Sequence, residues 1–152
     1  MITNGSTPIS RYYFQPKVGG DYAIMFGMLK HLLEWDQQAI AKSKESVFDR
    51  SFIVVNTIGF EEMRAEVQNT SWSDIHPHTG LSPEHLEALA KLYLESKRAI
   101  FCWGMGITQH RHGTANVHML ANLMLARGHI CRPGAGLAPI RGHSNVQGDR
   151  TM

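Results

Sequence analysis

The sequence predicts an α/β fold with a parallel sheet, and three consecutive features lead to that prediction. A helical apolar repeat with a strong start signal occupies residues 82–98, and the apolar run 99–103 that follows is typical of a buried strand. Gly104 and Gly106 come directly after that run, and a second helical repeat spans residues 114–128. Helix, strand, glycine loop and helix in this order form the pattern of a parallel α/β sheet.

The N-terminal part is predicted to hold one helix between two irregular segments. Residues 1–20 are polar and contain prolines and a glycine pair, so they are expected to be extended. Asp21 stands where a helix N-cap belongs, and apolar residues recur at helical spacing to about Trp35. The polar residues 36–46 have poor periodicity, which predicts a loop.

The middle of the chain gives weaker signals. The apolar run 52–55 fits either a buried strand or the inner face of a short helix that begins at Asp49. Gly59 then interrupts the chain, and residues 60–67 have the spacing of another short helix. Residues 76–78, which read His-Pro-His, are expected to form a surface turn.

Length and composition place the chain among single-domain globular proteins. It has 152 residues, of which 43% are apolar and 18% are charged, and this is enough for one core. It has no apolar run long enough for a membrane span, and its first residues do not form a secretory signal. Cys102 and Cys131 lie far apart and outside any CxxC pattern. This excludes a disulfide framework or a cysteine metal motif within the chain and predicts a cytoplasmic location.

The charge is distributed unevenly along the chain. Residues 1–100 hold ten basic and twelve acidic residues, whereas residues 101–152 hold five basic residues and one acid. All five basic residues of the second part are arginines, and the same stretch holds eight of the 14 glycines. Guanidinium groups on a glycine-rich backbone suit phosphates or carboxylates. Because the first hundred residues are net acidic and no aromatic residues alternate with the arginines, a nucleic-acid partner is not expected.

Three motifs in the C-terminal half have both a binding and a structural interpretation. Gly104 and Gly106 let backbone N–H groups approach a phosphate, but they equally fit an ordinary strand-to-helix turn. Met105 and Gln109 stand just beyond the strand end, where open α/β sheets bind ligands, although Gln109 could equally satisfy a helix start. Residues 110–112, His-Arg-His, offer only two metal ligands, which favours polar or phosphate contacts over a metal site.

The C-terminal residues 131–152 have no periodic pattern and combine glycine, arginine and amide side chains. Such a long Gly/Arg-rich loop could wrap a large polar ligand. Disorder is the alternative, but serine, glutamate and lysine, which are common in disordered segments, are nearly absent here.

Two motifs together resemble a known family. Residues 103–109 have the pattern W-x-M-G-x-x-Q, and residues 139–148 have the pattern P-x-R-G-x-x-N-x-Q-G. With the pair Gly19-Gly20 and Asp21, they resemble molybdopterin oxidoreductases of the formate dehydrogenase alpha-subunit type, in order along nearly the whole chain. The resemblance implies a Rossmann-like parallel-sheet segment and favours a helix over a strand for residues 49–57.

The resemblance also implies a cofactor and a set of residues that contact it. In the family, two molybdopterin guanine dinucleotides hold a molybdenum or tungsten atom. The resemblance assigns guanosine contacts to the glycine-glycine-aspartate element, pterin contacts to the methionine and glutamine, and a place beside the metal and the substrate carboxylate to the arginine. The positions implied for cofactor binding are Gly19, Gly20, Asp21, Met105, Gln109, Arg141, Gly142 and His143, with Arg141 also catalytic. His143 stands where close formate dehydrogenases have a glutamine.

Several parts of the family have no counterpart in this sequence. The cysteine or selenocysteine metal ligand and the cysteines of a 4Fe–4S cluster are absent, so no metal ligand is predicted within the chain. We therefore expect a fragment of a larger enzyme, inactive by itself, which depends on the remaining domains for formate oxidation. Residues 1–128 would form part of the cofactor-binding domain, and residues 129–152 would lead into a neighbouring domain. The alternative function is a stand-alone phosphate- or nucleotide-binding module without catalysis.

Overall fold

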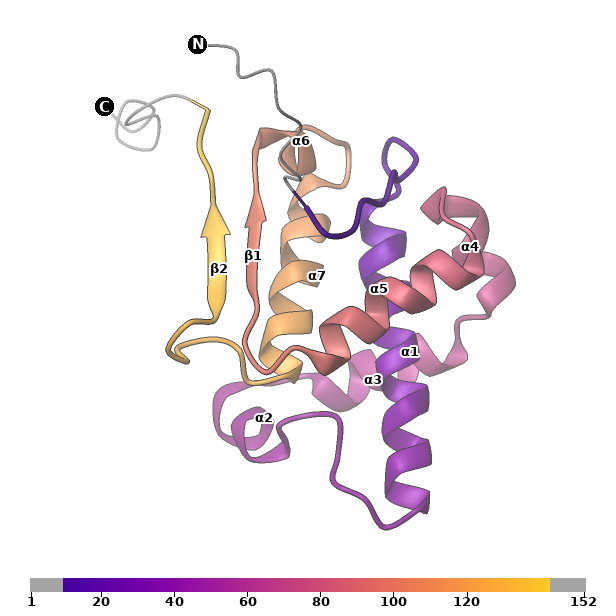
Figure 1. Ribbon diagram of the computed structural model, residues 1–152, viewed down its shortest axis with the longest axis vertical. Coiled ribbons are helices and arrows are strands. Elements are labelled where there is room, and N and C mark those ends of the chain that lie inside the picture. The colour runs from indigo at the N-terminus through magenta and orange to yellow at the C-terminus, as the bar shows by residue number, and fades with distance from the viewer. Residues whose placement is uncertain (1–9, 143–152) are drawn as a thin grey trace.

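The computed structural model describes residues 10–142, which form seven helices and two strands (Figure 1). Their order combines a run of helices with a helix–strand–helix–strand unit at the C-terminal side. The elements are α1 (Asp21–Ala41), α2 (Arg50–Asn56), α3 (Phe60–Asn69), α4 (Trp72–Thr79), α5 (Pro83–Glu95), β1 (Ile100–Trp103), α6 (Met105–Thr108), α7 (Gly113–Ala126) and β2 (Gly136–Pro139).

The two strands form a parallel pair, which confirms the α/β prediction. Ile100 lies opposite Gly136 and Trp103 opposite Pro139, and α6 and α7 connect the strands (Figure 1). Backbone hydrogen bonds at both ends of the pair include one from the Ile140 N–H to the Trp103 carbonyl at 2.7 Å. The prediction of no regular structure after residue 131 is therefore wrong for β2. That strand is too short for a periodic pattern and is specified by its pairing with β1.

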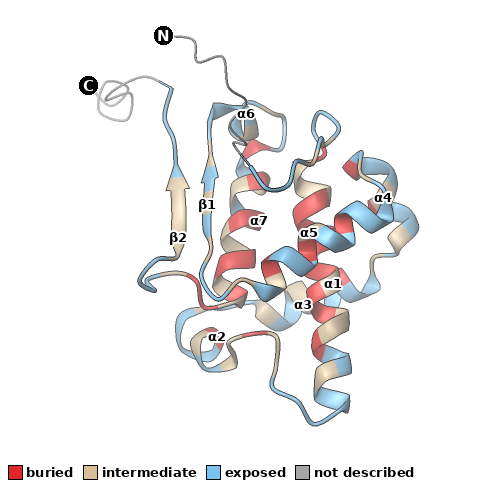
Figure 2. Cartoon of the chain, viewed as in Figure 1, coloured by how far each residue is buried: buried red, intermediate tan, exposed pale blue. Residues whose placement is uncertain are grey.

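The core is built around α1, which contacts α3, α4, α5 and α7. Buried residues gather on α1 and α7 (Figure 2), and the largest fully buried apolar side chains come from four of the helices. They are Leu29, Leu32, Val67, Leu86, Leu123 and Met124. Within the part of the chain that the structure describes, no helix has both the length and the hydropathy to cross a bilayer.

Helix α1 continues to Ala41, so the prediction of a loop from residue 36 is wrong in its first half. The reason is Asp36, which is polar but only 2% exposed. Its carboxylate accepts hydrogen bonds from the Ser46 hydroxyl at 2.6 Å and the Val47 N–H at 2.7 Å, and Arg50 pairs with it at 2.5 Å. The buried carboxylate is thus fully paired by residues 46–50, and these contacts hold the C-terminal part of α1 against the start of α2.

Local end signals explain two further elements. The Asp49 carboxylate accepts a hydrogen bond from the Phe52 N–H at 3.0 Å, and residues 50–56 form a helix, as the resemblance favours.

The surface turn predicted at residues 76–78 is wrong, because these residues form the last turn of α4. The Ser71 side chain caps this helix, and the rings of Trp72 and His76 stack at 5.0 Å across one helical turn.

Candidate functional site

The site predicted from the sequence lies at one end of the molecule. The carboxyl ends of β1 and β2 point to the same end as α6, and α1 begins there too (Figure 1). Open α/β sheets bind ligands at this edge because the loops that follow the strands converge on it. Two neighbouring hollows occupy this end, one between the strand ends and one between α1 and α7.

The strand-end hollow has a volume of about 200 Å³ and contains three of the predicted residues, Met105, Arg141 and Gly142. Met105 follows β1 and Gly142 follows β2, and their contact closes one wall of the hollow. A Cβ on Gly142 would lie 2.7 Å from both Sδ and Cε of Met105, so a larger residue there would displace the end of the methionine side chain. The Arg141 side chain is exposed beside this contact.

Met105 is presented by a single helical turn. In α6 the Thr108 hydroxyl donates to the Met105 carbonyl at 3.0 Å, and the Gln109 N–H donates to the same carbonyl at 2.9 Å. Gln109, predicted to contact the cofactor with Met105, is exposed at the end of this turn. The two residues therefore share one rigid turn beyond β1, as their spacing suggested.

The helix-start hollow has a volume of about 610 Å³, within the range of about 300–1,000 Å³ typical of small-molecule sites. Its walls combine aromatic and apolar residues of α1 with polar groups from α3, α4 and the loop before α7. The residues are Gly19, Tyr22, Ala23, Phe26, Glu66, Thr70, Asp74, Ile75, His78, His110, Arg111, His112, Ala115 and Asn116. Burial and, to a lesser degree, the Glu66 carboxylate raise the pKa of the Tyr22 phenol, so it remains a hydrogen-bond donor.

Asp21 connects the two predicted motifs. It lies in the first turn of α1, and its Oδ2 is 4.0 Å from Nε2 of His110, which directly follows Gln109. The two side chains are 25% and 28% exposed, and His110 lines the helix-start hollow. The beginning of α1 and the loop after β1 thus meet in space, although they are far apart in the sequence.

The two glycines before α1 differ in their surroundings, since Gly19 has open space beside it and Gly20 is closely packed. Gly19 has a φ of +79° and no atom within 4 Å of an added Cβ, and it lines the helix-start hollow. Gly20 is buried, and a Cβ there would lie 2.7–2.9 Å from the carbonyl oxygens of His78, Thr79 and Lys17. Gly20 is therefore required for close packing of α1 against the end of α4, whereas Gly19 has its open side toward the hollow.

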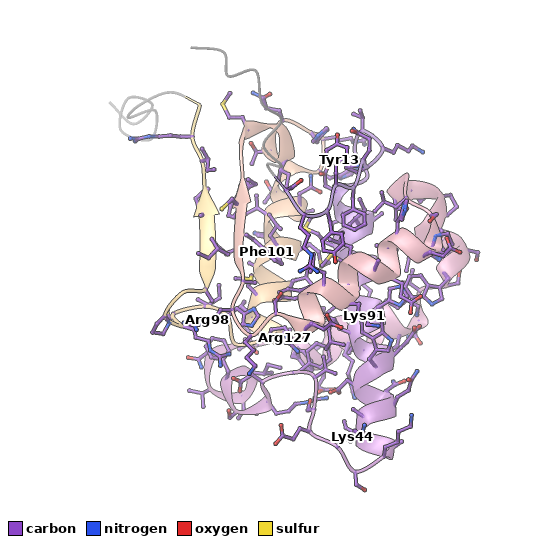
Figure 3. The ribbon with its side chains drawn as sticks, in the orientation of Figure 1. Tyr13, Lys44, Lys91, Arg98, Phe101 and Arg127 are labelled. Carbon is purple, nitrogen blue, oxygen red and sulfur yellow. The ribbon has the colours of Figure 1, made fainter. Side chains whose placement is uncertain are left out.

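The arginines of the C-terminal half do not all belong to this end. Arg111 lines the helix-start hollow and Arg141 the strand-end hollow. Arg127 instead lies near Arg98 at the far end of β1 (Figure 3). Its guanidinium donates to the carbonyls of Val47 at 2.6 Å and Leu94 at 2.9 Å, and it lies over the Tyr93 ring.

The remaining predicted positions and one residue that the sequence did not suggest complete the description. His143 lies outside the described residues. Within residues 10–142, no group of three or more His, Cys, Asp or Glu side chains could hold a metal ion. Asn116, which lines the larger hollow, is only 2% exposed. The sequence could have indicated Asn116, because it is a polar residue on the face of the predicted helix 114–128 that is expected to be buried.

The arrangement is typical of α/β proteins that bind a ligand at the carboxyl ends of their strands. A family model for molybdopterin oxidoreductases matches residues 27–151, and the chain belongs to that family. It is 48% identical over 152 residues to the protein YdeP of Escherichia coli, covering all of this chain and 20% of YdeP.

Two further relatives broaden the comparison. The chain is 39% identical over 151 residues to an uncharacterized oxidoreductase of Mycobacterium tuberculosis, covering 99% of this chain and 19% of that protein. It is 36% identical over 105 residues to formate dehydrogenase H of Escherichia coli, covering 69% of this chain and 15% of that enzyme. The chain therefore spans about a fifth of the length of the curated relatives that it matches most fully.

Proposed function

We propose that the chain is the central α/β part of an oxidoreductase that carries two molybdopterin guanine dinucleotides with molybdenum or tungsten, and that formate or a similar small carboxylate is its substrate. The observation that carries this proposal is the contact of Met105 with Gly142, beside Arg141, at the carboxyl end of a parallel strand pair. Membership of the molybdopterin oxidoreductase family and the likeness to formate dehydrogenase H support it.

The residues at this end fit the organic part of such a cofactor. Gly19 and Gly104 leave open backbone that a phosphate or pterin can approach, since an added Cβ would meet no atom closer than 4.0 Å at either position. Arg111 and Arg141 supply cationic donors, and Gln109 supplies an exposed amide. This donor set suits phosphates and the pterin ring rather than a metal ion.

We assign separate tasks to the two hollows. Gly19, which lines the helix-start hollow, and Asp21, which lies 4.0 Å from His110 of that hollow, would hold the guanosine end. Met105, Gln109 and Gly142 would hold the pterin. His143, adjacent to Gly142 in the sequence, is proposed as a further cofactor contact. Gly20 would contribute only through the position of α1, because its backbone is enclosed by α4.

Arg141 would act on the substrate. Its guanidinium can hold a carboxylate with two parallel hydrogen bonds and offset the negative charge of the substrate. When bound, the metal cofactor supplies a two-electron acceptor, so that formate leaves as CO₂ with release of a proton. The protein residues bind and orient the carboxylate, and the redox chemistry belongs to the cofactor.

Exposed apolar surface supports the proposal that further domains cover this part. Parallel sheets normally have both faces covered, yet Ile100 at the start of β1 is 58% exposed. Val54, Val55 and Ile58 at the end of α2 are 80–100% exposed. In this proposal the 4Fe–4S cluster and the metal ligand reside in those further domains, with residues 129–152 leading into one of them, and the chain by itself is inactive.

The decisive experiment is to purify the full-length protein and measure molybdenum, tungsten and oxidised pterin per polypeptide. We expect about two pterin guanine dinucleotides for each metal atom, as the proposal requires. A protein without metal and pterin would refute the proposal. If that protein bound guanosine nucleotides, the alternative of a phosphate- or nucleotide-binding module would stand instead.

The role of Arg141 has its own test in the same holoenzyme. Arg141→Ala should retain the cofactor and lose at least about a hundredfold in kcat/KM for formate, because a charge-assisted bidentate pair contributes about 3 kcal/mol. Arg141→Lys should recover only part of this, since lysine lacks the planar fork. Arg98→Ala, at the other end of β1, is the matched control. Turnover that is unchanged in Arg141→Ala would remove this residue from the mechanism.

A further inference from the structure

The turn that carries Met105 is too short to hold itself in place. Helix α6 has only four residues, Met105–Thr108, so most of its carbonyl groups lack a partner within the helix. One of them, the Ile107 carbonyl, accepts a hydrogen bond at 2.9 Å from the side-chain amide of Asn116. Asn116 lies in the first turn of α7 and is 2% exposed. The end of α6 is therefore tied to α7 by a buried side chain.

A second contact closes the same junction. Gly113 begins α7, and an added Cβ there would lie 2.3 Å from the Thr108 carbonyl oxygen. The Gly113 N–H donates to the His110 carbonyl at 3.0 Å, which closes the loop between the two helices. Two successive carbonyls at the end of α6 thus meet α7, the Ile107 carbonyl through the Asn116 amide and the Thr108 carbonyl through close approach to Gly113.

That position decides where the Met105 side chain lies. Met105 begins the turn whose last residues are fixed to α7, and its Sδ and Cε occupy the space next to Gly142. Met105 is 44% exposed, so packing around its own side chain does not hold it. Its backbone is held from both directions, by β1 two residues before it and by the connection of α6 to α7 after it.

We infer that Asn116 is a positioning residue for the cofactor site: its amide fixes α6 so that Met105 stands over Gly142 beside Arg141. The inference rests on the proposed function for its consequence, which is retention of the pterin. The placement of Met105 itself can be measured without any cofactor. Asn116 acts on Met105 through Ile107 and lies outside the strand-end hollow, but it also lines the helix-start hollow. Pterin loss can therefore follow from either hollow, and the Met105 signal is the measurement that decides the positioning role.

The experiment compares three variants of the full-length protein. Asn116→Ala removes the donor, and Asn116→Asp keeps the shape but offers an acceptor to the Ile107 carbonyl. Asn122→Ala is the matched control, because it lies on the same helix beside the hollow lined by Ile58 and Phe60. Two quantities are measured: the NMR signal of the isotope-labelled Met105 methyl group, and the rate at which pterin is lost on repeated gel filtration.

Both Asn116 variants should change the chemical shift of the Met105 methyl group. They should also lose pterin about tenfold faster than the wild type, which corresponds to the loss of one buried hydrogen bond. Asn122→Ala should do neither. An unmoved Met105 signal in Asn116→Asp, or in Asn116→Ala should the aspartate variant not fold, would overturn the inference. If the wild type holds no pterin, the proposed function fails, and the methyl signal still decides the role of Asn116.

Discussion

Replacing Gly20 by alanine separates a packing role from a ligand-binding role at the start of α1. The resemblance treats Gly19 and Gly20 as equivalent cofactor contacts, but their surroundings differ. At Gly20 a methyl group would meet the carbonyl oxygens of His78, Thr79 and Lys17 at 2.7, 2.8 and 2.9 Å. These distances are well inside van der Waals contact, and all three atoms belong to the backbone. No side-chain rotation can relieve the clash.

The expected cost follows from that geometry. Inserting a methyl group into a packed core typically costs about 1–3 kcal/mol, and rigid backbone neighbours place this case at about 3 kcal/mol. For a chain of this size, that lowers Tm by about 6–12 °C. At Gly19 the space is open, and the cost is that of a left-handed φ of +79°, about 1 kcal/mol or about 2–4 °C.

The assay is thermal and urea denaturation of Gly20→Ala and Gly19→Ala, followed by circular dichroism, with Gly19→Asn as a control that tolerates left-handed φ values. Gly20→Ala should be clearly the less stable, while Gly19→Ala should fold and reveal any ligand role of that position. Equal stability of the two alanine variants would refute the close approach of α1 to α4 on which the reasoning depends.

Two further predictions concern buried polar groups at the far end of α7. Arg127→Met should cost about 3 kcal/mol in urea denaturation, because it leaves the carbonyls of Val47 and Leu94 without donors, and a loss below about 1 kcal/mol would contradict this. Burial, aided by the guanidinium groups of Arg127 and Arg132, lowers the pKa of His129 below 6.5. The unfolded chain then takes up the proton first, so stability is full above about pH 6.5 and falls on acidification, by at most about 1.4 kcal/mol per pH unit. His129→Gln should flatten that pH dependence in urea titrations, and an unchanged slope would exclude His129 as its source.

Local signals in the sequence predicted two helix starts correctly, but the prediction of Asp21 as an N-cap is wrong, because Asp21 is the first residue of α1 and Gly20 holds the cap position. Ser82 accepts a hydrogen bond from the His85 N–H at 3.3 Å, and α5 begins at Pro83, where the cap and the proline indicated it. Asp49 caps α2 in the same way. Such signals involve residues within one turn of each other, so they can be read without knowing the rest of the fold.

The errors arose where distant residues decide the structure. Residues 136–139 form β2 only because they pair with β1. That strand lies more than 30 residues earlier in the sequence, before α6 and α7. Residues 36–41 remain helical because Arg50 and the chain around Ser46 satisfy Asp36 after the helix has ended. At residues 76–78, Pro77 favoured a turn, but the Ser71 cap and the contact of Trp72 with His76 keep the helix intact.

The same distinction applies to the candidate site. The composition of residues 101–152 indicated an anion-binding half, but its arginines have different surroundings. Arg127 is used in packing, whereas Arg111 and Arg141 line hollows at the end where both strands finish. Charge counting therefore indicates the candidate site only through Arg111 and Arg141, which come after β1 and β2. In the proposed function, the positive charge that would meet a polyanionic ligand lies in the loops after β1 and β2, and the α6–α7 junction is part of the first of those loops.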